Sequence, residues 1–135
     1  MRKVIISGIV AGIILFVVSV LSLYLTIYLL PSLALEYYNP AFKSNSIGNV
    51  LYFIHPFIIA FALAWFWDRF KDQLGKSFWV KDLEFGIIYS VVATLPSMWI
   101  IYSAMSVTLE QVATWFIYGF IQSVIAGIVF NRLNP

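Results

Sequence analysis

The 135-residue sequence has no cysteine, a single histidine and few charged residues. Without cysteine, disulfide exchange, thiolate catalysis and iron–sulfur ligation are excluded. One histidine cannot supply an intrachain haem, copper or zinc site that needs two imidazoles. The net charge of +2 is small and scattered, and it predicts no nucleic-acid partner. We therefore expect a chain with no bound metal or cofactor.

The residues that are present are mostly apolar: 62% are hydrophobic and 10% are charged, against about 45–50% and 25% in soluble domains. Stretches without Asp, Glu, Lys or Arg that are long enough to cross about 30 Å of hydrocarbon cover residues 4–30, 47–67, 85–105 and 111–131. This pattern predicts one all-α domain, an integral membrane four-helix bundle over residues 1–135. We expect the second and third helices to kink at Pro56 and Pro96, because proline removes a backbone donor.

The basic residues predict the orientation of these spans. With the N-terminus inside, seven of the eight Lys and Arg residues fall on the cytoplasmic side: Arg2, Lys3, Arg69, Lys71, Lys76, Lys81 and Arg132. Lys43 alone falls outside. Because Lys and Arg are retained on the cytoplasmic side, we predict a multi-pass protein of the cytoplasmic (inner) membrane with both termini in the cytoplasm.

Polar residues near the expected helix ends suit capping roles. Thr108 and Gln111 have the spacing of a capping box for the fourth helix. Asp82 and Glu84 can open the third helix, where acids favour the helix dipole. The mixed-charge segment 68–84 is expected to lie as an amphipathic turn on the inner headgroups, or to dock a cytoplasmic partner.

Small residues four apart predict where helices meet in lipid, because they let backbones approach closely. The first span has this spacing at Gly8 and Gly12, and the fourth span has it at Gly119, Ser123 and Gly127. One interpretation packs the two patches against each other inside the bundle. The other makes one patch an external seam for self-association or for another membrane subunit.

Few polar side chains lie at membrane depth. His55 is the one ionisable group inside a predicted span, and Gln122, Thr94 and Ser97 lie at comparable depths on other helices. These four residues can form a polar ligand or proton site. Alternatively, they are hydrogen-bonded contacts that hold the helices together.

No constellation of paired carboxylates, nucleophile elbow or phosphate loop is found, so we expect no enzyme. The leading hypothesis is a non-catalytic scaffold or accessory subunit that packs against membrane lipids or another membrane protein. Its partners are then lipids and either further copies of the chain, as a homo-oligomer, or a larger membrane complex. The alternative is a homo-oligomeric channel or transporter for a small solute, with a midplane polar site around His55.

Overall fold

The computed structural model describes residues 1–38, 46–75 and 77–135, so the predicted positions of Lys43 and Lys76 lie outside it. About 90% of the described residues are helical and none is in a strand. In chain order the helices are α1 (Arg2–Leu29), α2 (Pro31–Glu36), α3 (Ser46–Phe70), η1 (Lys71–Gln73), α4 (Phe78–Tyr89), η2 (Ser90–Thr94), α5 (Leu95–Ala104) and α6 (Leu109–Leu133). The stretches 2–29, 46–73, 78–104 and 109–133 are long and apolar enough to cross a membrane. The predicted all-α four-helix membrane bundle is confirmed.

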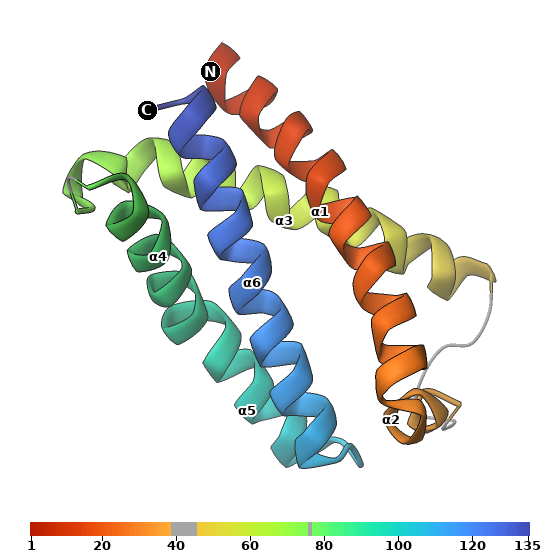
Figure 1. The fold of residues 1–135 in the computed structure, drawn as a ribbon. Coiled ribbons are helices and arrows are strands. Elements are labelled where there is room, and N and C mark those ends of the chain that lie inside the picture. Colours follow the sequence, from red (N-terminus) through yellow and green to blue (C-terminus); the bar gives the residue numbers. More distant parts are fainter. Residues whose placement is uncertain (39–45, 76) are drawn as a thin grey trace.

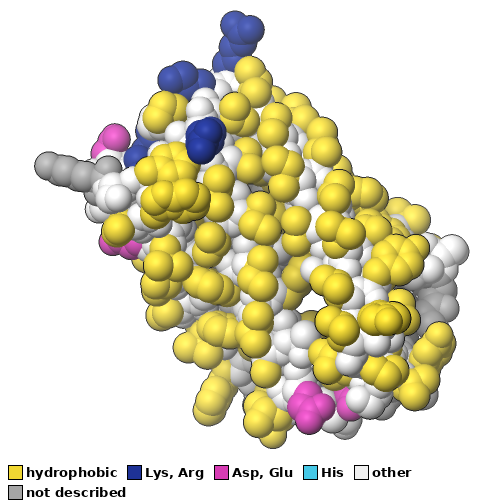
Figure 2. Space-filling view, in the orientation of Figure 1, with side chains coloured by type: hydrophobic (Ala, Val, Ile, Leu, Met, Phe, Trp, Pro, Cys, Tyr) yellow, Lys and Arg dark blue, Asp and Glu magenta, His cyan; other side chains and the backbone are white. Residues whose placement is uncertain are grey.

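Helix α6 is the centre of the bundle. It packs against α1, α3, α4, η2 and α5, whereas α1 packs mainly on α3. In Figure 1, α6 runs between α1 on one side and α4 with α5 on the other, and α3 crosses the bundle behind them. Figure 2 shows hydrophobic side chains over most of this face, as expected for helices that contact lipid.

The aromatic core lies toward the end of the bundle that holds both termini. Trp67, Phe85 and Phe130 are fully buried there, with ring centroids between 5.2 and 6.2 Å apart. These rings come from α3, α4 and α6, so one cluster joins three of the four spans. Aromatic pairs at these distances contribute about 0.5–1.5 kcal/mol each beyond the area they bury.

The helix of the third span begins at Phe78, ahead of the predicted span start at Phe85. The residues assigned to a loop on the headgroups are the end of α3, the turn η1 and the first turns of α4. Asp82 is buried inside α4 instead of capping it, and the Glu84 carboxylate accepts the Gly75 N–H at 2.6 Å across the short connection. Both acids have hydrogen-bond partners within the fold, Asn131 for Asp82 and Gly75 for Glu84, and the helix continues through both positions.

The two prolines inside spans have different surroundings. Helix α3 is continuous through Pro56. In the third span a π-helical turn, η2, comes directly before α5, in which Pro96 is the second residue. A π turn shifts the hydrogen-bond register and is a recognised cause of bending. The π turn therefore lies next to Pro96, where the sequence predicts a bend.

The predicted capping box of α6 is confirmed. The Thr108 hydroxyl accepts the Gln111 N–H at 3.3 Å, and the Gln111 side chain accepts the Thr108 N–H at 3.1 Å. Thr108 also donates to Glu36 at the end of α2, at 2.9 Å. The start of α6 is thus linked to the short helix that follows α1.

Candidate functional site

The residues of the predicted polar site do not lie together. Gln122 and Thr94 are buried, with 1% and 7% of their surface exposed. His55 is exposed on the outer surface of α3. Ser97 is also exposed, and its hydroxyl donates to the Ala93 carbonyl of its own helix at 2.7 Å. The structure places two of the four residues inside the bundle and two on its surface.

Gln122 belongs to a hydrogen-bond chain between α6 and α1. Its Nε2 donates to the Tyr118 hydroxyl at 2.8 Å, and the Tyr118 and Ser19 hydroxyl oxygens are 2.5 Å apart. Ser19 donates its own proton to the Leu15 carbonyl at 2.8 Å, so Tyr118 is the donor to Ser19. Each donor therefore has an acceptor, and the chain ends on a backbone carbonyl. This arrangement joins two helices and does not need a ligand.

The small-residue patches face other helices than predicted. A methyl group added to Gly8 or Gly12 would lie 2.8 or 2.7 Å from the rings of Phe61 and Phe57 on α3. The first patch therefore accommodates aromatic side chains of α3. Direct pairing of the two patches required these glycines to face the fourth span, but their nearest neighbours are the rings of α3.

The patch on α6 faces the third span. A methyl group added to Gly119 would lie 3.1 Å from Thr94, and one added to Gly127 would lie 3.3 Å from Phe85. The Ser123 hydroxyl lies 3.4 Å from the Gly86 carbonyl oxygen of α4. Both patches are thus occupied inside the bundle, and these five positions form no outward seam.

Asp82, which the sequence indicated as a helix-start residue, is a buried acid of α4. One carboxylate oxygen accepts from the Asn131 side chain at 2.9 Å, while the other is buried and has no partner among the described residues. Asn131 also donates to the Phe78 carbonyl at 3.3 Å. Asp82 lies four residues before Gly86, and Asn131 lies four residues after Gly127. Residues four apart share one face of a helix, so each of these polar residues lies on the same face as a glycine. This spacing is the sequence feature that indicates the contact.

A second polar cluster connects the end of α6 to the end of α3. Asn134 is 1% exposed, its side chain donates to Asp68 at 2.8 Å and accepts from Lys71 at 2.8 Å, and its carbonyl accepts from Trp67 at 2.9 Å. All of these partners lie in α3 or η1. The cluster stabilises the packing of the two helix ends.

A cavity lies between α3 and the third span. It has a volume of about 370 Å³. Its lining residues are Ala62, Leu63, Trp65 and Phe66 from α3 and Ile88, Tyr89, Val92 and Ala93 from α4 and η2. We call this cavity the lateral groove.

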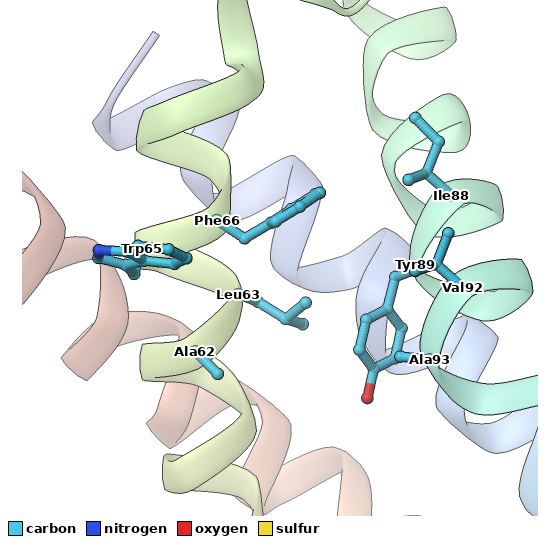
Figure 3. Close-up of a pocket in the computed structure, with 8 residues that line it drawn as sticks. All are labelled: Ala62, Leu63, Trp65, Phe66, Ile88, Tyr89, Val92 and Ala93. Atoms are coloured by element: carbon cyan, nitrogen blue, oxygen red, sulfur yellow. The ribbon is translucent and has the colours of Figure 1, made fainter. Parts of the chain in front are cut away.

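Figure 3 shows how the walls of the lateral groove are built. Leu63 and Phe66 point from α3 toward Ile88 and Tyr89, whereas Trp65 points to the other side of α3. The side chains are apolar except for the Tyr89 hydroxyl and the Trp65 indole N–H. A pocket of this size and lining suits an apolar ligand, because small-molecule pockets measure about 300–1,000 Å³.

The described residues, 1–38, 46–75 and 77–135, contain no group of three His, Asp or Glu side chains that could hold a metal ion. The four long apolar helices define the chain as a small multi-pass α-helical membrane protein. Comparison with protein-family models, with curated proteins and with solved structures finds no match. Its function must be argued from the molecule itself.

Proposed function

We propose that this protein is a non-catalytic scaffold or accessory subunit, which acts through sideways contacts with membrane lipids or with another membrane protein. The observation that carries the proposal is the lateral groove, since it lies between two spanning helices and has apolar walls. A site of this kind receives a membrane constituent more readily than a water-soluble solute, because it offers few hydrogen bonds to replace hydration.

The contacts between side chains inside the bundle support the same proposal. The Gln122, Tyr118 and Ser19 side chains are engaged with one another, and both glycine patches are filled by side chains of neighbouring helices. These features account for the stability of the bundle. The exposed apolar surface and the groove remain for contacts with lipids or with a foreign subunit.

We also propose that both termini lie in the cytoplasm and that the membrane is the inner membrane. Both termini lie at the same end of the bundle (Figure 1), and the visible Lys and Arg side chains gather at that end (Figure 2). Positive residues near span ends are retained in the cytoplasm. The clustering supports this orientation.

A homo-oligomeric transporter or channel for a small solute is the second candidate. The π-helical turn η2 favours it, because such turns are frequent at functional sites. The Ser90 hydroxyl in this turn is 2% exposed and has no partner among the described residues. A transported solute would supply the missing partner.

Native mass spectrometry of protein extracted gently from its own membrane distinguishes the scaffold or accessory subunit from the transporter or channel. The proposal predicts the 15.4 kDa chain with bound phospholipid, or with a foreign membrane subunit in a fixed ratio. Simple multiples of the chain mass with neither lipid nor subunit would contradict the proposal and favour the transporter. Matched extraction of an unrelated multi-pass protein controls for lipid carried over without specificity.

A further inference from the structure

Asp82 has a buried side chain that is only partly satisfied by hydrogen bonds. The residue is 1% exposed. Its Oδ1 atom accepts from the Asn131 side chain at 2.9 Å, whereas its Oδ2 atom is buried and has no partner among the residues that the structure describes. An ionised carboxylate only accepts hydrogen bonds, through two oxygen atoms with about four lone-pair sites. One amide donor therefore leaves most of these sites without a hydrogen bond.

The close approach of α4 to α6 explains why Asp82 is buried. Gly127 lies opposite it on α6, and a methyl group added to Gly127 would lie 3.4 Å from both the Cα atom and the carbonyl oxygen of Asp82. Because Gly127 has no side chain, the two backbones come together at this point. Phe85 is fully buried and lies against the same glycine, three residues further along α4. The carboxyl group of Asp82 therefore lies between two helices and out of contact with water.

Two cations lie near Asp82, Lys81 on α4 and Arg132 on α6, and neither is bonded to it. The Lys81 Nζ atom lies 5.1 Å from the centroid of the Trp67 ring. The guanidinium carbon of Arg132 lies 4.9 Å from the centroid of the Phe78 ring. Both cations are thus directed to aromatic rings, which attract them electrostatically. Neither supplies the hydrogen bond that a buried carboxylate needs.

The other charged side chains at this end of the bundle have partners of their own or are exposed. The Glu84 carboxylate accepts the Gly75 N–H at 2.6 Å. Asp68 and Lys71, at the end of α3 and in η1, are both bonded to Asn134. Within the described part of the chain, the exposed charged residues at this end are Arg2, Lys3, Arg69 and Asp72. None of these described groups bonds to the buried acid.

We infer that Asp82 binds a proton on its Oδ2 atom and that this proton keeps α4 packed against α6. A neutral carboxyl group costs less free energy to bury than a carboxylate that lacks donors. A metal ion is a poorer occupant, because it needs several oxygen ligands, and the described residues contain no group of three acidic or histidine side chains that could hold one. Asp82 lies four residues after Phe78, the first residue of α4, so water beyond the start of the helix can supply the proton.

The inference goes beyond the proposed function, since it adds a proton-binding site inside the bundle. Solid-state NMR of the full-length protein in lipid bilayers tests it, with ¹³C at the carboxyl carbon of every aspartate. The chain has three aspartates, Asp68, Asp72 and Asp82. At neutral pH we expect one resonance with the chemical shift of a neutral acid and two with that of a carboxylate. Three carboxylate resonances in wild type would overturn the inference, whether or not any variant folds.

Two variants assign the resonance of the neutral acid. Asp82→Asn should remove it, because the amide has no titrating proton. Asp72→Asn is the matched control, since Asp72 is an exposed acid near the same end, and it should leave the neutral-acid resonance in place. A neutral-acid resonance that persists in Asp82→Asn would assign the proton to another aspartate and overturn the inference.

Amide hydrogen exchange in the first turns of α4 tests the role of the proton in packing. Opening of the contact between α4 and α6 exposes Asp82 to water and releases the proton. The ratio of the exchange rate in wild type to that in Asp82→Asn should therefore rise by about tenfold per pH unit while the neutral acid is observed. Comparing the two proteins at each pH removes the base catalysis of exchange itself. Asp82→Leu, which is also uncharged, replaces Asp82→Asn if that variant does not fold, and a constant ratio would overturn the link between the proton and the packing.

Discussion

The hydrogen bond between Tyr118 and Ser19 makes the contact between α6 and α1 measurable by a double-mutant cycle. Tyr118→Phe removes one hydroxyl, and Ser19→Ala removes the oxygen that lies 2.5 Å from it. An interhelical hydrogen bond in a membrane contributes about 0.6 kcal/mol on average and up to about 1.7 kcal/mol. Tyr118→Phe also leaves the buried Gln122 amide without the acceptor that lies 2.8 Å away, at a cost of about 1–3 kcal/mol.

We therefore expect Tyr118→Phe to lower the free energy of unfolding by about 2 kcal/mol and Ser19→Ala by about 1 kcal/mol. The double variant should lose about 0.6–1.7 kcal/mol less than the sum of the two, because both changes remove the same bond. Adding Gln122→Leu should reduce the cost of Tyr118→Phe, since no donor is then left unpaired.

Unfolding in mixed detergent micelles, followed by circular dichroism, measures these energies. Tyr24→Phe is the control, because Tyr24 is 67% exposed and its variant should stay within about 0.5 kcal/mol of wild type. A coupling energy below about 0.3 kcal/mol is what independent sites give, and it would refute the hydrogen-bond chain.

Three other changes test contacts within the bundle. Gly86→Ile should destabilise the protein by about 1–3 kcal/mol in the same assay, because the added side chain meets Val124 on α6; an unchanged midpoint would disprove this close approach. Asn131→Leu should cost more than the double variant with Asp82→Leu, since the single change leaves a buried carboxylate unpaired; the reverse order would show that the two side chains do not interact. Thr108→Ala should weaken the start of α6 by about 1 kcal/mol, measured as faster amide exchange in its first turn; unaltered exchange would count against the cap.

The number of spans and the helical class follow from the sequence, because the apolar stretches are long enough that no other membrane structure satisfies the backbone. The residue at which the third helix starts does not follow from the sequence in this way. Charges at Asp82 and Glu84 indicate a boundary, but Asp82 is held by Asn131 and Glu84 by Gly75. The contact of Asp82 is with a residue far along the chain, and hydropathy alone does not contain it.

The small residues illustrate a similar limit. Spacing predicts the faces that carry Gly12 and Gly119, and both residues are buried. It does not identify the partner, since a smooth helix face accepts any side chain of suitable shape. The rings of α3 fill the first patch and Thr94 lies against the second. His55 shows the same limit for the polar site, because helix rotation, which the sequence does not specify, places it on the surface.

Solvent access to the interior tests the central claim most directly. In this cysteine-free chain, single cysteines at Ser19 and Gln122 probe the interior of the bundle, and a cysteine at the exposed Ser77 probes the connection to α4. A scaffold or accessory protein predicts that a membrane-impermeant maleimide, given access to both sides of membrane vesicles, labels the Ser77→Cys variant alone. All three should be labelled after denaturation. Rapid labelling of Ser19→Cys or Gln122→Cys in intact membranes would reveal a water-filled path through the bundle and contradict the account.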